Sequence, residues 1–288
     1  MRIDAHHHLW NLSAVDYPWL MARGVERFFG DPSPIQRDYL IDEYRRDAAG
    51  FSASVHIQVG AADGWAEAQW VQSVADATPN WPMVQVAFCD LTSPDLSAQL
   101  DRFQTLPTLR GVRQIVGRAP GEDAQTGTNA LLADPRFADG LRQVGERGLS
   151  FDLQLIPDLY DDMARVLDHA PDTAIALCHA GSPHDRSAAG LKDWEARLNT
   201  LSARPQITCK LSGLGMFDHS WTAESIRPVV ETCLDQFGPD RCMFGSNFPV
   251  DSLYSDYATI TCAIEKIVPV PQHATIFHDT AAGFYGLP

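Results

Sequence analysis

Short apolar runs alternate along this chain with longer segments in which apolar residues recur every three or four positions. The runs return at intervals of roughly 30 residues and have strand length, and the segments between them have helical periodicity, so the pattern predicts repeated βα units. The expected strands are 2–8, 53–59, 83–88, 111–116, 149–155, 174–179, 206–211 and 242–246. The expected helices include 65–77, 95–104, 135–147, 160–170, 191–201, 222–237 and 280–285.

Eight such units in 288 residues predict a single-domain (β/α)8 barrel, and a doubly wound open sheet is the alternative. Because no repeat, low-complexity tract or Pro/Gly-rich linker divides the chain, we expect one domain over residues 1–288. The active side chains of such barrels lie at the carboxyl ends of the strands. The candidate chemistry should therefore lie where each apolar run stops.

Alternation within the strands indicates which side chains share a face, because neighbours in a strand point to opposite sides. In the first strand, alternation groups Asp4 with His6 and His8 and places Ala5 and His7 on the other face. Polar residues share a face in three further strands: His56 with Gln58, Asp152 with Gln154, and Thr208 with Lys210 and Ser212. A purely structural sheet would not need this pattern.

Three histidines are expected to converge, since His6 and His8 end the first strand and His179 ends the sixth. Three imidazoles suit an open zinc site, in which the metal lowers the pKa of a bound water to about 7. The same groups can act without metal, one histidine taking a proton from water while the others or Lys210 polarise a carbonyl. The sequence leaves both mechanisms open, and it leaves His56 open between a site residue and a core residue.

Composition narrows the class of protein. With 45% hydrophobic and 20% charged residues, the chain has the makeup of a globular protein with a sizeable core. A net charge of −15 argues against nucleic acid or an anionic membrane as partner, and it does nothing to attract an anionic substrate. The partner that we expect is a small-molecule substrate. No apolar run is long enough to span a membrane, and the N-terminus has no secretory pattern, so we expect a cytoplasmic location.

The six cysteines form no Cys-x-x-Cys pair and are expected to be free, buried thiols rather than zinc ligands. The oligomeric state is left open.

These residues resemble the amidohydrolase superfamily of (β/α)8 barrels, of the amidohydrolase 2 type. The segments that carry the resemblance are 3–10, 16–19, 55–58, 110–114, 149–154, 179–181, 209–214 and 243–251. This ordered set covers nearly the whole chain and is most similar to the lactonase branch, with L-fuconolactonase and 2-pyrone-4,6-dicarboxylate lactonase. The resemblance implies a hydrolase that opens the lactone ring of a sugar acid or a related small carboxylic acid.

Departures from the superfamily pattern affect the expected metal content. Binuclear members use a carboxylated lysine on the fourth strand, where this chain has Arg113 and Gln114. Many members also place a histidine on the fifth strand, where this chain has Asp152 and Gln154. We therefore expect no binuclear centre. One divalent metal, zinc being the best candidate, is compatible with His6, His8 and His179 but is not required.

The expected general base also departs from the superfamily, which uses an aspartate that closes the eighth strand. Here that position is Asn247, and a carboxamide cannot take a proton from water at neutral pH. Asp251, four residues on, and His179 are the candidate replacements. Asp251 can equally be the N-cap of the following helix.

The sequence thus predicts that water attacks a lactone carbonyl. His6, His8 and Lys210 are expected to hold the carbonyl, and His179 or Asp251 to take the proton. The residues expected to bind substrate are Arg113, Gln58, Gln154, Trp10 and Trp19. Two other functions stay open: a zinc-dependent decarboxylase or hydratase acting on an aromatic or unsaturated acid, and a catalytically silent barrel that binds a sugar acid, as Asn247 suggests.

Overall fold

Eight parallel strands form one sheet in the order β1 to β8, and a computed structural model describes residues 1–120 and 127–288. The strands are β1 (Ile3–His7), β2 (Ala53–Ile57), β3 (Met83–Phe88), β4 (Leu109–Arg113), β5 (Ser150–Leu153), β6 (Ile175–Leu177), β7 (Ile207–Leu211) and β8 (Cys242–Phe244). The ring closes where the backbone of His8 donates to Phe248 O at 2.8 Å and that of Asn247 donates to His6 O at 2.7 Å. The predicted (β/α)8 barrel is confirmed.

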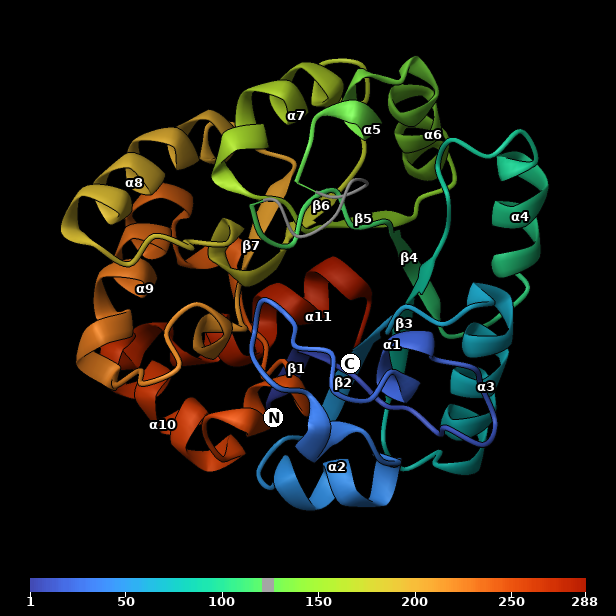
Figure 1. Ribbon diagram of the computed structural model, residues 1–288, viewed down its shortest axis with the longest axis horizontal. Coiled ribbons are helices and arrows are strands. Elements are labelled where there is room, and N and C mark those ends of the chain that lie inside the picture. The colour runs from blue at the N-terminus through green and yellow to red at the C-terminus, as the bar shows by residue number, and fades with distance from the viewer. Residues whose placement is uncertain (121–126) are drawn as a thin grey trace.

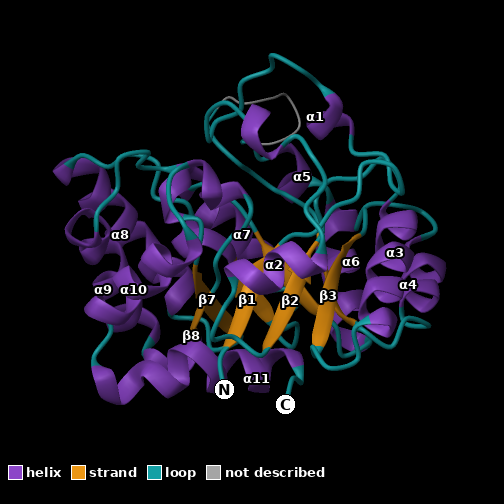
Figure 2. Cartoon of the chain, turned by 90° about the horizontal axis from the view of Figure 1, so that it is seen from below, coloured by secondary structure: helices purple, strands orange, loops and turns teal. Residues whose placement is uncertain are grey.

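Helices surround the strands, as Figure 1 shows. They are α1 (Pro18–Met21), α2 (Ile41–Asp47), α3 (Gly64–Ala77), α4 (Leu96–Phe103), α5 (Ala130–Ala133), α6 (Pro135–Glu146), α7 (Tyr160–Leu167), α8 (Ala188–Ser202), α9 (Ala223–Phe237), α10 (Tyr257–Ile267) and α11 (Thr280–Tyr285). In Figure 2, α11 lies below the strands, and the long loops that carry α1 and α5 rise above them. The barrel is therefore covered at one end and open to loops at the other.

The barrel interior is a small apolar cluster closed by the C-terminal segment. Its members come from five strands and the end of the chain: Ile3, Ala5, Ala53, Val55, Ile57, Val84, Val86, Ala176, Met243, Ala281, Tyr285 and Leu287. A second, larger cluster packs the outer faces of the strands against the helices. Because α11 fills the lower end, a substrate would have to enter from the upper end.

The alternation predicted for β1 is wrong in part. Ala5 packs inside the barrel, whereas Asp4 lies outside it and accepts hydrogen bonds from Tyr44 in α2 and Tyr257 in α10, both at 3.0 Å. The pairing of β1 with β2 shifts register between Asp4 and His7. This irregularity interrupts the alternation of side chains between the two faces of β1. As a result, His6 contacts His8, whereas Asp4 points away from them.

In β2 the structure decides the position of His56, which the sequence left open. Val55 and Ile57 belong to the interior cluster, so His56 faces outward, where its ring centroid lies 5.8 Å from that of His7. The Nε2 of His56 contacts Leu9 O at 3.2 Å. His56 is thus a core residue between barrel and helices, and Gln58 lies beyond the strand end.

Several elements end earlier than predicted, and α2 and α10 are additional helices. Strand β6 stops at Leu177, and His179 follows in a left-handed conformation with φ 56°. Helix α10 is rich in β-branched residues, which weakens its helical signal in sequence. Its N-cap is Asp256, which accepts from Thr259 N at 2.7 Å, so capping of α10 is not the role of Asp251.

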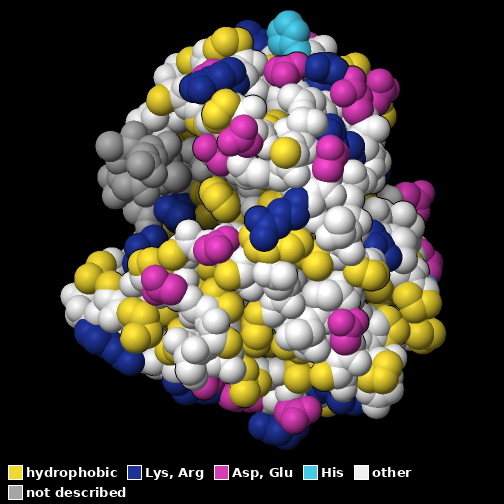
Figure 3. All heavy atoms as spheres, turned by 90° about the vertical axis from the view of Figure 1, so that its right-hand side faces the viewer, with side chains coloured by type: hydrophobic (Ala, Val, Ile, Leu, Met, Phe, Trp, Pro, Cys, Tyr) yellow, Lys and Arg dark blue, Asp and Glu magenta, His cyan; other side chains and the backbone are white. Residues whose placement is uncertain are grey.

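Charges on the surface are paired locally. On the face formed by α3, α4 and α6, acidic and basic side chains are interspersed (Figure 3), and Arg142 pairs with both Asp139 and Glu146 along α6. Among the described residues, no helix is long and apolar enough to cross a membrane.

Candidate active site

A cavity of about 750 Å³ opens at the carboxyl ends of the strands. Eight residues predicted from the sequence line it: His8, Trp10, Trp19, Gln58, Arg113, Gln154, His179 and Asn247. Three more, His6, Lys210 and Asp251, are fully buried beside or behind its wall. The predicted residues are therefore brought to one end of the barrel, but not all of them can touch a substrate.

The three predicted histidines form a cluster at the cavity floor. The ring centroid of His6 lies 5.1 Å from that of His8 and 4.6 Å from that of His179. His8 donates through Nδ1 to Ile57 O at 2.8 Å, and His179 Nδ1 lies 3.0 Å from Ser212 Oγ. Each of these two rings thus has Nδ1 committed to a protein oxygen, which leaves Nε2 for chemistry.

Burial keeps the histidine cluster neutral. It lowers the pKa of His8 to about 3, with the Arg113 charge acting in the same direction. Desolvation likewise lowers the pKa of His6 and His179 well below the ordinary value. Neutral imidazoles have lone pairs, so these rings can accept a proton or bind a metal.

Asn247 and Asp251 lie one behind the other. The Nδ2 of Asn247 donates to Asp251 Oδ1 at 3.0 Å, and Asn247 Oδ1 lies 3.4 Å from His8 Nε2. Desolvation raises the pKa of Asp251 to about 7. That pKa would suit a general base, yet Asp251 contacts Asn247 and is 2% exposed, whereas Asn247 lines the cavity.

Arg113 is a buried cation held by uncharged groups. Its guanidinium donates to the Gln58 carbonyl oxygen at 3.3 Å and to the side-chain oxygen of Gln154. Its Nε has no partner among the described residues. The Arg113 guanidinium is buried and contacts no carboxylate of the described residues. It is therefore suited to bind an anionic or carbonyl group of a ligand.

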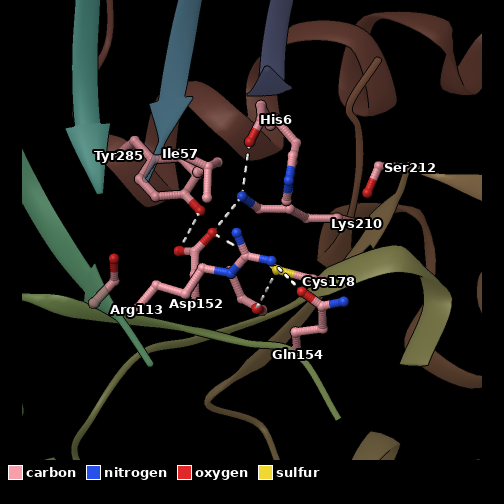
Figure 4. Close-up of polar contacts among 12 residues, drawn as sticks. His6, Ile57, Arg113, Asp152, Gln154, Cys178, Lys210, Ser212 and Tyr285 are labelled. Carbon is pink, nitrogen blue, oxygen red and sulfur yellow. Dashed lines mark hydrogen bonds and ion pairs between the residues drawn. The ribbon is translucent and has the colours of Figure 1, made fainter. Parts of the chain in front are cut away.

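Lys210 lies below the cavity in a buried network that Figure 4 shows. Its ammonium donates to Asp152 Oδ2 at 2.5 Å and to Ala5 O at 2.7 Å, and it lies 5.1 Å from the centre of the Tyr285 ring. Tyr285 donates to Asp152 Oδ1 at 2.8 Å. These contacts commit the ammonium to the protein, so the geometry gives Lys210 a supporting position rather than a place against a substrate carbonyl.

Donor atoms at metal-ligand spacing are found around His6. Both ring nitrogens of His6 are buried without a hydrogen-bond partner in the described chain. The ligand atoms of His6, Asp152 and Cys178 lie within 4.8 Å of one another, which adds a cysteine that the sequence had not suggested. Burial raises the pKa of Cys178 to about 11, and Lys210 already pairs with Asp152. Among the described residues, His6, His8 and His179 are not a set whose ligand atoms all lie within 4.8 Å of one another, so the three-histidine site predicted from the sequence is not brought together at metal-ligand spacing.

Sequence reasoning missed the aromatic wall of the cavity. Phe28 and Phe29 line it from the loop between α1 and α2, and Phe88 and Met216 add apolar surface. The segment 11–40 has no clear periodicity and is therefore expected to be a long loop. Because long loops in compact domains are often functional, this segment could have been identified as part of the cavity wall. Ser212 was grouped with Lys210 by alternation, but its contact with His179 was not predicted.

Comparisons with known proteins agree with this geometry. The sequence profile of a family described as amidohydrolase matches residues 3–287. An uncharacterised protein of Sinorhizobium fredii is 36% identical, over 98% of this chain and 97% of its own length. An L-fucono-1,5-lactonase of Burkholderia multivorans is 30% identical, over 100% of this chain and 97% of its own.

A solved structure shares the whole fold. A crystal structure of an amidohydrolase from Burkholderia multivorans with bound zinc superimposes with a TM-score of 0.83 at 26% identity, covering 100% of both chains. That protein holds a zinc ion in the same architecture.

Proposed function

Because this chain belongs to the amidohydrolase family, we propose that it hydrolyses the lactone ring of a sugar acid or a related small carboxylic acid. The observation that carries the proposal is the convergence of neutral imidazoles and an unpaired guanidinium nitrogen on one cavity. The lactonase name of a relative that matches over the full chain supports the substrate class.

The residues of the cavity have different roles in the proposed reaction. Arg113 binds the carboxylate or the lactone carbonyl, and the partly exposed Trp19 offers a face for a ring to stack on, with the buried Trp10 packed against it. Water attacks the carbonyl carbon while the Nε2 of His8 or His179 takes its proton. When the ring carbon–oxygen bond breaks, the leaving oxygen takes that proton, and the product is a hydroxy acid.

A divalent metal has a place in this site. His6, His8 and His179, the ligands predicted from the sequence, would hold it only if their rings moved closer together than in the described arrangement, and it would supply Lewis-acid polarisation of the carbonyl. The orphaned ring nitrogens of His6 support this assignment. The carbonyl contact of His8 Nδ1 sets the tautomer of that ring, and Ser212 occupies Nδ1 of His179, so the Nε2 atoms of both rings are the ones placed to serve either mechanism.

Hydrolysis of a panel of sugar-acid lactones, followed with a pH indicator, tests the proposal. The protein is first stripped with a chelator and then assayed with and without added zinc. Turnover in both samples supports proton transfer to an imidazole alone, and turnover only after reloading identifies the histidines as ligands. If no lactone is opened in either sample, while carbon dioxide is released from an aromatic acid, the site belongs to a decarboxylase and the proposal fails.

A further inference from the structure

We propose that Asp251 is a positioning residue that holds the Asn247 carboxamide with its oxygen toward the reacting centre, where that oxygen orients the attacking water. The inference rests on the proposed lactonase function and names the groups that aim its nucleophile. It starts from one juxtaposition, in which a buried carboxylate lies behind an amide and an imidazole lies in front of it.

The carboxylate determines which way the amide faces. Asp251 Oδ1 accepts from Asn247 Nδ2 at 3.0 Å. An ionised carboxylate only accepts hydrogen bonds, so it selects the amide orientation that presents NH₂ to it. The amide oxygen is then forced to the opposite side, which is the cavity side.

The backbone of Asn247 is held as firmly as its side chain. Its N–H donates to His6 O at 2.7 Å, and its φ of 56° lies in the left-handed region that asparagine tolerates better than most residues. Asn247 lines the cavity, and Asp251 does not. The amide oxygen is thus a fixed acceptor at the cavity wall, and Asp251 reaches the site only through it.

The group facing that oxygen is a second acceptor. His8 donates its Nδ1 proton to Ile57 O, so the Nε2 of the neutral ring carries a lone pair. Asn247 Oδ1 lies 3.4 Å from this nitrogen, and two acceptors do not attract each other. A water molecule that donates one hydrogen to each would satisfy both and keep a lone pair for the lactone carbonyl carbon.

The chemical step balances with these groups. The water oxygen bonds to the carbonyl carbon, the carbonyl electron pair moves onto its oxygen, and the proton facing His8 passes to Nε2. Collapse re-forms the carbonyl and breaks the ring carbon–oxygen bond, and the leaving oxygen takes the proton from His8. Asn247 keeps its hydrogen bond to the other hydrogen throughout and never carries charge, as a carboxamide requires.

A double-mutant cycle tests whether Asp251 acts through Asn247. At about pH 8, where Asp251 is ionised, we expect Asp251→Asn to lower kcat about 10- to 100-fold with KM within about twofold, because a carboxamide at 251 no longer selects one orientation of its neighbour. Asn247→Ala should cost a similar factor. In the Asn247→Ala background, Asp251→Asn should cost nothing further.

Two outcomes overturn the inference. A full additional loss in the Asn247→Ala background would mean that Asp251 acts independently, and abolition by Asp251→Asn with little effect of Asn247→Ala would make Asp251 the base. The exchanged variant Asn247→Asp/Asp251→Asn supplies a rescue, since the amide at 251 can donate to a carboxylate at 247. It should recover activity beyond either single variant.

A readout without turnover separates this inference from the proposed function. The side-chain NH₂ of Asn247 is bound to a buried carboxylate and should exchange slowly with solvent in NMR spectra of the wild-type chain. Asp251→Asn should speed that exchange at unchanged unfolding midpoint. Slow exchange in both proteins would contradict the orientation even if lactones are hydrolysed, and failure to hydrolyse lactones would leave this measurement decisive.

Discussion

At the scale of single residues, the structure distinguishes groups that reach the cavity from groups that support them. His179 reaches it, and its Nδ1 contact with Ser212 leaves Nε2 for the substrate side. We expect His179→Ala to lower kcat/KM by about 10²- to 10⁴-fold, the usual contribution of a positioned acid–base group. Lactone hydrolysis kinetics and a circular-dichroism spectrum check it, with exposed His169→Ala as the matched control. Unchanged kinetics would remove His179 from the site.

Arg113 should contribute to binding more than to the chemical step. A charge-assisted hydrogen bond contributes about 1.5–3 kcal/mol, so Arg113→Met should raise KM for a carboxylate-bearing lactone roughly 10- to 100-fold, with a smaller effect on kcat. Steady-state kinetics check it, and Arg142→Met is the control, because Arg142 lies on the surface of α6. A lower kcat at constant KM would instead place Arg113 on the developing oxyanion.

At the scale of elements, the strands deliver these residues, and their irregularities could not be predicted. Alternation placed Asp152 of β5 and Lys210 of β7 on the polar faces of their strands, and these two side chains meet inside the barrel. It failed in β1, because the register shift after Asp4 depends on pairing with β2, which no local pattern encodes. It left His56 undecided because both faces of β2 are buried, and the face that carries Ser54 and His56 lies away from the barrel interior.

Contacts between elements that are distant in the sequence could not be predicted either. The eight strands and the order of the barrel followed from apolar periodicity, but the position of Lys210 required knowing that Tyr285 of α11 meets Asp152 of β5. The resemblance identified the segments that carry the site. It did not show that Asp251 lies behind Asn247 as seen from the cavity, because the relative position of two side chains depends on the tertiary structure.

The ion pair across the barrel yields a stability prediction at this scale. Removing one partner of a buried pair leaves an uncompensated charge, so Lys210→Met should lower the free energy of unfolding by about 3–5 kcal/mol. The double variant Lys210→Met/Asp152→Asn should be less destabilised than the sum of the two single variants. Urea unfolding measures all three. Additive losses would show that the Lys210–Asp152 contact contributes nothing specific.

At the scale of the whole molecule, buried histidines set the pH dependence of stability. Burial holds the pKa of His56 and His184 at about 4 and lowers that of His6, His7, His8 and His179. The folded chain keeps these rings neutral, whereas the unfolded chain protonates them below about pH 6.5. Their contribution to stability is therefore present above that pH and is lost as the pH falls.

Three buried carboxyls oppose this trend. Desolvation raises the pKa of Asp251 to about 7 and that of Glu67 to about 8, and it also raises the pKa of Asp4, so all three bind a proton more tightly in the folded chain and favour folding at lower pH. The six histidines outnumber them between about pH 4.5 and 6.5, so the unfolded state binds more protons in that window. The free energy of unfolding should fall on acidification, by about 1.4 kcal/mol per pH unit for each unmatched proton.

Urea unfolding at a series of pH values measures this slope, and His56→Gln tests its origin. Glutamine can still donate to Leu9 O, the contact that His56 makes, but it does not titrate. The variant should lose part of the slope between about pH 4.5 and 6.5 and little stability above it, because only the protonation difference of one ring has been removed. A wild-type profile that is flat or rises toward acid would mean that the folded chain protonates its buried histidines, and the neutral cluster on which the proposed proton transfer depends would then not exist.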